Sequence, residues 1–186
     1  MKLLPGLQTV LEELTRRFGG QIEKAHAPQP NELYLHARLE LASALCSSFY
    51  NKYQGRLAGV FAEDARAGHK VYFVYYLYAL DMAHGFVVVR VPVPEDKPEM
   101  ISLTNAIPAL NWHEREIQDL FGIRFIGHPN SRRCALHDDW PDVHPLRKDF
   151  DLRTKLGPFT GPRHNFREVE GEGVFQVPVG PVHAGI

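Results

Sequence analysis

The stretch Val71-Tyr72-Phe73-Val74-Tyr75-Tyr76-Leu77-Tyr78-Ala79-Leu80 consists entirely of apolar and aromatic residues. Aromatic and β-branched side chains favour strands. Apolar residues at every position are typical of a strand that is covered over much of both faces. The stretch therefore predicts the central strand of a sheet. Its ten residues are about half of the roughly 20 that a membrane-spanning helix needs, so we expect the chain to reach a membrane only through a partner.

Four more strands are predicted on either side of this central one. They are short runs bounded by turn-forming residues, Gln21–His26, Glu32–Ala37, Arg56–Glu63 and Phe86–Val93. Proline lacks the backbone N–H that a sheet interior requires. Pro92 and Pro94 therefore indicate that the last of these strands ends there or lies at an edge.

Apolar residues at helical spacing predict three helices. The first covers residues 3–18 and ends at Gly19-Gly20. The second covers residues 42–50, and Cys46 on its apolar face is expected to be a small buried hydrophobe rather than a reactive thiol. The third is Trp112–Phe121, with Asn111 as N-cap, Glu114 as capping-box partner and Gly122 just past its end.

These elements predict an α+β fold. We expect a mixed, mainly antiparallel sheet of about five strands with two or three helices, followed by an extended irregular C-terminal arm. Residues 1–126, including the 112–121 helix, would form the core domain, residues 127–170 the arm, and residues 171–186 a separate final segment. The length of 186 residues, with 44% hydrophobic and 23% charged residues, fits one packed domain with a tail.

Composition excludes several classes of function. A net charge of −1 argues against a generic nucleic-acid binder, which would be strongly basic. Cys46 and Cys134 are far apart and form no CxxC pair, so neither a disulfide framework nor a four-cysteine iron–sulfur cluster is expected within the chain. The first six residues are too poor in apolar side chains for a signal peptide.

Residues 111–150 hold six Lys or Arg, seven Asp or Glu and four His, with too few apolar residues for a second core. On spacing alone the acids of the helix could be a solvated face, and Arg115 and Asp119 could form an ion pair. An Arg-rich, Trp-bearing segment of this kind is also typical of an interface between proteins. Two further hypotheses are a metal site using His128, Cys134, His137, Asp138, Asp139 and His144, and a lipid or nucleic-acid surface within residues 147–167.

Three motifs in this region resemble a known family. They are Glu114-Arg115-Glu116-Ile117-Gln118-Asp119-Leu120-Phe121-Gly122, then His128-Pro129 with Arg132-Arg133, and His144-Pro145-Leu146-Arg147-Lys148-Asp149-Phe150. Their order and spacing resemble the C subunit of respiratory complex I, the 30-kDa NADH dehydrogenase family. Cys134-Ala135 stands where that family tends to place an aliphatic pair.

The final segment, residues 171–186, resembles the start of a [NiFe]-hydrogenase large subunit of the complex-I-like type, and Asp138-Asp139-Trp140-Pro141 is similar to that branch. This resemblance implies a non-catalytic docking domain of a membrane-associated hydrogenase of the formate hydrogenlyase or hydrogenase-4 type. The C subunit of NADH:quinone oxidoreductase is the alternative. A stand-alone metal-binding protein is a less favoured one.

The resemblance further implies that this chain holds no cofactor, while the Ni–Fe centre and iron–sulfur clusters belong to partner subunits or to downstream sequence. The implied partners are the large subunit and the iron–sulfur small subunit, at a cytoplasmic position peripheral to the inner membrane. We expect the arm to gain its order from these partners. The predicted docking residues are Glu114, Arg115, Glu116, Asp119, Phe121, His128, Pro129, Arg132, Arg133, His144, Pro145, Arg147, Lys148 and Asp149.

Overall fold

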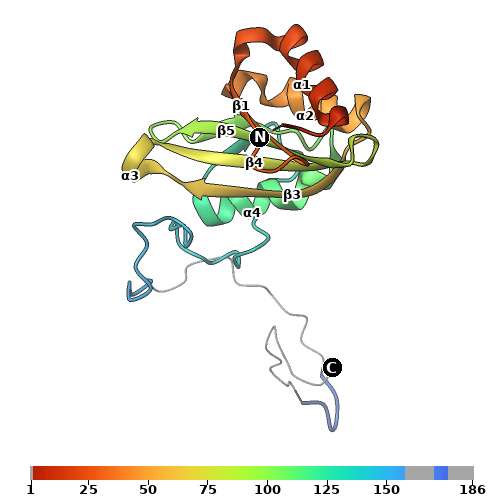
Figure 1. Ribbon diagram of the computed structural model, residues 1–186. Helices are drawn as coiled ribbons and strands as arrows, with labels where there is room; N and C mark the ends of the chain where they lie inside the picture. The colour runs from red at the N-terminus through yellow and green to blue at the C-terminus, as the bar shows by residue number, and fades with distance from the viewer. Residues whose placement is uncertain (1, 158–169, 176–186) are drawn as a thin grey trace.

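The computed structural model describes residues 2–157 and 170–175, and its centre is a five-stranded sheet (Figure 1). The strand order is β1-β2-β5-β4-β3. In this sheet β2 and β5 are parallel, and the other neighbours are antiparallel. The mixed, mainly antiparallel α+β prediction is confirmed. The strands are β1 (Ile22–His26), β2 (Glu32–Ala37), β3 (Arg56–Asp64), β4 (Val71–Leu80) and β5 (Gly85–Pro94).

Helices and a small second sheet complete the described part of the chain. The helices are α1 (Pro5–Phe18), α2 (Ala42–Ser47), which continues as a π-helical turn over Ser48–Lys52, α3 (Arg66–His69) and α4 (Asn111–Phe121). Short 3₁₀ turns cover Gly19–Gln21, Leu39–Leu41, Asp81–Ala83 and Pro108–Leu110. The second sheet is a parallel pair, β6 (Glu99–Ile101) and β7 (Arg124–Ile126). The sequence does not predict it, because strands of three residues show no usable alternation.

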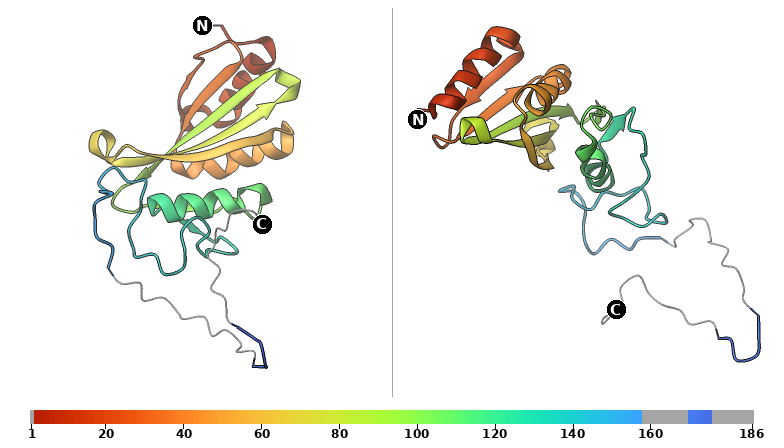
Figure 2. Two further views of the ribbon diagram at one scale, coloured as in Figure 1. Left: turned by 90° about the horizontal axis from the view of Figure 1, so that it is seen from below. Right: turned by 90° about the vertical axis from the view of Figure 1, so that its right-hand side faces the viewer.

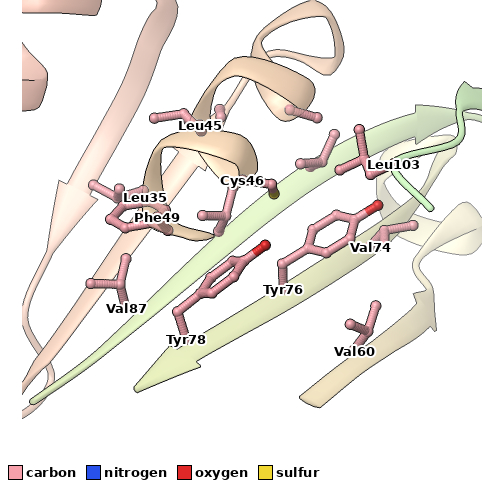
Figure 3. Close-up of a cluster of buried hydrophobic side chains, with 14 of the residues drawn as sticks. Leu35, Leu45, Cys46, Phe49, Val60, Val74, Tyr76, Tyr78, Val87 and Leu103 are labelled. Atoms are coloured by element: carbon pink, nitrogen blue, oxygen red, sulfur yellow. The ribbon is translucent and has the colours of Figure 1, made fainter. Parts of the chain in front are cut away.

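The core lies on one face of the main sheet. Tyr72, Val74, Tyr76 and Tyr78 of β4 are at most 1% exposed. In Figure 3, Tyr76 and Tyr78 point toward α2, where Cys46 faces them. Cys46 is 0% exposed, which confirms that it is a buried hydrophobe, and this burial raises the pKa of its thiol to about 12.

The central-strand prediction is confirmed, with one difference. β4 lies between β5 and β3 and has the predicted bounds, but only one of its faces is fully covered. Phe73, Tyr75 and Leu77 on the other face are half-buried. β5 pairs with β2 only as far as Arg90 and ends at Pro94, as its prolines predicted.

The capping box predicted for α4 is wrong. Asn111 is the first residue of the helix, Leu110 occupies the N-cap position without a side-chain bond, and a 3₁₀ turn precedes it. The C-terminal end follows the prediction, since Gly122 has φ +74° in the left-handed region. No helix in residues 2–157 and 170–175 is long and apolar enough to cross a bilayer.

Candidate docking site

Helix α4 carries the motif residues, and the structure buries most of its charges. Glu114 is 0% exposed, Arg115 8% and Asp119 4%. Charged side chains are almost never buried at this level without partners. The solvated-face interpretation is therefore wrong for Glu114 and Asp119, and each of the three buried residues has a specific set of hydrogen bonds.

Glu114 joins α4 to the loop that follows β6. Its Oε1 accepts a hydrogen bond from the Leu103 backbone N–H at 2.7 Å. Its Oε2 accepts from Ser102 Oγ at 2.5 Å and from Thr104 Oγ1 at 2.9 Å. His128 Nε2 lies 3.9 Å from the same oxygen and donates to the Asn111 carbonyl at 3.2 Å. Glu114 is thus a buried structural acceptor and not a group that a partner can reach.

Arg115 and Asp119 do not pair with each other. Arg115 donates through Nε to the Arg132 carbonyl at 2.7 Å and through Nη2 to the Arg133 carbonyl at 2.9 Å. Oδ2 of Asp119 accepts three backbone N–H groups, from Cys134, Ala135 and Leu136, at 2.8, 2.9 and 3.2 Å. The predicted ion pair is replaced by two side chains that hold the backbone of residues 132–136 against the helix.

The third motif closes the C-terminal end of α4. His144 Nδ1 donates to the Asp119 carbonyl at 2.8 Å, and Leu146 N donates to the Leu120 carbonyl at 3.0 Å. Arg147 Nε donates to the Phe121 carbonyl at 2.7 Å. The last carbonyls of a helix have no partner within it, so these contacts satisfy groups that would otherwise need water.

Beyond Arg147 the arm is fixed to the end of β3. Asp64, 4% exposed, accepts from the Lys148 backbone N–H at 2.9 Å and from Arg66 Nη2 at 2.7 Å. Arg66 also donates to Asp149 at 2.8 Å. The expectation that a partner orders the arm therefore does not hold over residues 128–149, because contacts within the chain already fix them.

Several side chains on the outer side of α4 and the arm remain exposed. Trp112 is 67% exposed and the guanidinium of Arg115 lies 4.7 Å from its ring centre. Glu116, one helical turn further on, and Arg132 are also exposed. We call Trp112, Glu116 and Arg132 the α4–arm surface. Trp112 was missing from the predicted set, although its position opposite the buried Ile117 was a usable signal.

The remaining predicted docking residues divide by exposure. Phe121 and the side chain of His128 are buried. Arg133, His144, Pro145 and Arg147 are half-buried, while Pro129, Lys148 and Asp149 are exposed. The structure thus brings the motifs together around α4, but most of the predicted residues contact their own chain rather than solvent.

The metal hypothesis gains no geometric support. Within residues 2–157 and 170–175, no three His, Cys, Asp or Glu side chains are placed to share a metal ion. The His137 ring packs edge-on against Trp140, and Cys134 Sγ lies 3.9 Å from the Trp112 carbonyl. Residues 158–169 and 176–186, which include part of the proposed lipid or nucleic-acid surface and most of the hydrogenase-like segment, lie outside the described residues.

Asp64→Asn should lower the free energy of unfolding by about 2 kcal/mol at neutral pH, because charge-assisted hydrogen bonds are lost. The bond from Arg66 is the main cause that holds the pKa of Asp64 well below its ordinary value of 3.8. A lowered folded-state pKa stabilises the fold above that ordinary value, and the gain is lost as pH falls through the folded-state pKa. Urea unfolding should give a constant difference between wild type and variant from about pH 7 to 5, and a shrinking one below about pH 4. A difference that grew on acidification would contradict this role.

Known proteins match this chain over a region that contains the three motifs around α4. Residues 36–156 match the family described as respiratory-chain NADH dehydrogenase, 30 Kd subunit. The chain is 33% identical over 180 residues to hydrogenase-4 component G of Escherichia coli, covering 95% of this chain and 32% of that protein. It is 36% identical over 168 residues to the C/D subunit of NADH-quinone oxidoreductase of Methylococcus capsulatus, covering 83% of this chain and 28% of that protein. The chain therefore spans about a third of the length of these relatives.

A solved structure shares the fold. A trypsin-resistant fragment of Nqo5 matches with a TM-score of 0.57 at 26% identity, covering 67% of this chain and 98% of the fragment. The family match covers more than half of the 186 residues and includes all three motifs around α4. The resemblance read from those motifs is confirmed, and the chain belongs to the respiratory-chain NADH dehydrogenase 30 Kd subunit family.

Proposed function

We propose that this chain is a non-catalytic docking domain of a complex-I-like, membrane-associated [NiFe] hydrogenase of the formate hydrogenlyase type. The observation that carries the proposal is that α4 and the arm contain two sets of side chains, one buried and one exposed. Glu114, Arg115 and Asp119 face inward and fix the loops, so that Trp112 and Arg132 stand exposed on a rigid support. Aromatic and arginine side chains presented in this way are typical binding hot spots.

The chemistry of the surface supports a protein partner. Trp112 offers a large apolar area, and Glu116 and Arg132 offer one charge of each sign. Nη1 of Arg133 is buried and has no hydrogen-bond partner among the described residues, so it is not part of the surface that a partner can reach. A buried donor without an acceptor costs stability. The proposed partners are the large subunit and the iron–sulfur small subunit.

Two branches of the family compete for the assignment. The hydrogenase-4 relative aligns with 95% of this chain and the NADH-quinone oxidoreductase relative with 83%, which favours the hydrogenase branch. The C subunit of NADH:quinone oxidoreductase is the second candidate, supported by the family match and by slightly higher identity. The native gene sequence around this chain would separate them: a large-subunit sequence with nickel-binding cysteine pairs in the same reading frame would favour the hydrogenase branch, whereas the C/D relative shows that fusion alone does not.

The proposal places redox chemistry outside the described residues. The Ni–Fe centre and the iron–sulfur clusters belong to partner subunits or to downstream sequence. This chain holds those subunits in place and supplies no ligand to their metals. This chain would lie on the cytoplasmic side of the inner membrane and would contact the membrane only through other subunits of the complex.

Trp112→Ala tests the proposal in the native, tagged complex. We expect recovery of the iron–sulfur small subunit to fall about tenfold or more, because truncating a central aromatic anchor removes much of an interface's binding energy. Quantitative mass spectrometry of the purified complex gives the ratio of subunits. Met82→Ala is the matched control, since Met82 is also an exposed apolar residue, at 73%, but lies in the turn before β5.

Thermal melting of each variant separates assembly from folding. Trp112→Ala should melt close to wild type, because its ring is largely in solvent. Equal recovery of the small subunit in the Trp112 and Met82 variants would rule out the α4–arm surface as the docking site. Arg147→Ala is less informative, because Arg147 holds the Phe121 carbonyl and its loss should also lower the melting temperature.

A further inference from the structure

The main sheet has a second face that neither α1 nor α2 covers, and α4 borders it only at β3, where Phe121 lines a groove with Phe61 and Tyr75. α1 and α2 lie behind the strands in the left view of Figure 2, which shows this face toward the viewer. Residues that pair directly across a sheet project from the same face. The strand registers pair Lys24 with His36, His36 with Arg90, Arg90 with Tyr75, and Tyr75 with Phe61. One side chain from each strand therefore forms a continuous row, which we call the cross-sheet row.

One end of the row is aromatic. The rings of Phe61 and Tyr75 stack at 4.7 Å with an interplanar angle of 13°, and Phe61 is 51% exposed. The Tyr75 hydroxyl donates to Glu63 at 2.5 Å, which fixes the ring. A groove of about 500 Å³ runs from these rings to Leu146 of the arm, which is itself 53% exposed. Rigid exposed aromatics beside an apolar groove are typical of the apolar part of a protein interface.

The other end of the row is cationic. The guanidinium of Arg90 lies 3.4 Å from the centre of the Phe73 ring, and its Nη1 lies 3.3 Å from His36 Nδ1. Among the described residues, its buried Nε has no hydrogen-bond partner, and none of the ion pairs involves Arg90. Lys24, at the end of the row, is exposed. Within the described part of the chain, Arg90 is thus a positioned guanidinium without a carboxylate.

We propose that the cross-sheet row is a second protein-docking surface, distinct from the α4–arm surface. Its occupant is a segment of a partner subunit that places an aspartate or glutamate carboxylate on Arg90 and an apolar side chain on Phe61 and Tyr75. Because Nε is buried, the carboxylate would meet the two Nη groups, which can donate to it through two parallel N–H bonds. Arg90 and Phe61 lie two strands apart, a span of about 10 Å that one short segment can bridge.

Charge favours a protein segment over a nucleic acid. Aromatic and basic residues on an open sheet also suit single-stranded nucleic acid, but such surfaces carry a basic groove along the whole strand. Here Glu63 occupies the aromatic end, bonded to Tyr75, and the net charge of the chain is −1. A single carboxylate matches the guanidinium of Arg90 better than a polyanion does.

Site-specific photocrosslinking in the native complex tests this proposal. Phe61→p-benzoylphenylalanine places a crosslinker on the row, and Glu116→p-benzoylphenylalanine places one on the α4–arm surface as a reference. We expect a crosslink from position 61 to a peptide of another subunit that contains Asp or Glu near the attachment point. Arg90→Gln should reduce its yield by about tenfold. Arg16→Gln, an exposed arginine of α1 on the opposite side, should leave it unchanged.

Several outcomes would overturn the proposal. They are crosslinking from position 116 but none from position 61, crosslinks only to nucleic acid or to a second copy of this chain, and full yield in Arg90→Gln. Circular dichroism checks the fold of each variant. If Arg90→Gln unfolds, Arg90→Lys retains the charge without the paired donors, and a yield equal to wild type in that variant counts against the paired carboxylate. A crosslink from position 61 without one from position 116 would instead count against the α4–arm surface.

Discussion

Replacing Glu114 with alanine should lower the free energy of unfolding by about 3–5 kcal/mol, the largest effect we expect from a single side chain in this domain. The carboxyl group is fully buried and accepts three hydrogen bonds from residues 102–104. Alanine would leave three buried donors without an acceptor and a cavity beside α4. Each unsatisfied buried donor costs about 1–3 kcal/mol, with partial relief where water enters.

Glu114→Gln should cost less, about 1–2 kcal/mol, because the amide retains one oxygen and its shape. The Ser102 hydroxyl can rotate to accept from the new amide N–H. Glu116→Ala is the matched control, since this exposed residue lies two positions along the same helix and should change the free energy of unfolding by less than about 0.5 kcal/mol. Urea unfolding followed by circular dichroism gives all three values. Equal losses for the alanine variants at 114 and 116 would contradict a buried structural role for Glu114.

The strands and helices of the core were predictable because each has a local sequence signal, which is helical spacing in the helices and a run of strand-forming residues in the strands. The bounds of β2 and β4 agree with the prediction to the residue, since Glu32–Ala37 and Val71–Leu80 are rich in strand-forming residues and bounded by turn residues. The residues that bury Glu114 lie 10 to 12 positions before it in an irregular loop. No helical or strand period connects them to α4. An acidic helix with a solvated face and one with a buried carboxylate therefore have the same sequence pattern.

The order of the arm was missed for a related reason. Arg115, Asp119 and Arg147 all bond to backbone groups rather than to side chains. A backbone N–H or carbonyl is present at every residue, so the sequence does not show which one is used. From the sequence alone, only side chains of opposite charge indicate a pair, and Arg115 and Asp119 have the spacing for one. The salt bridge from Arg66 to Asp149 does join opposite charges, but its partners are 83 positions apart.

The motif residues that identify the family therefore act mainly within the chain. They fix the arm on α4, and this holds the exposed side chains of α4 and the arm next to one another, where a partner can bind them. A docking surface loses less entropy on binding when its loops are already ordered. This links the buried hydrogen bonds to function: loosening the arm should weaken assembly even where no contact residue changes.

Gly122→Ala tests that link, and we expect it to lower the free energy of unfolding by about 3 kcal/mol and to release residues 144–150. Gly122 has φ +74°, and a Cβ there would lie 2.3 Å from Arg147 Nη2 and 2.4 Å from His144 Nε2. The backbone conformation accounts for about 1 kcal/mol. The remaining loss comes from displacing the two side chains that bond the last carbonyls of α4.

Gly127→Ala separates the two contributions. Gly127 has φ +81°, but a Cβ there meets nothing within 4 Å, so this variant should lose only about 1 kcal/mol. Hydrogen exchange should show faster exchange at the backbone N–H groups of Leu146 and Arg147, which bond to Leu120 and His144, in the Gly122 variant alone. Recovery of the small subunit should fall with it, although the α4–arm surface is unchanged. If the two alanine variants lose equal stability and keep the arm equally protected, the His144–Arg147 closure does not hold the arm in place, and its order must come from Asp64 and Arg66 instead.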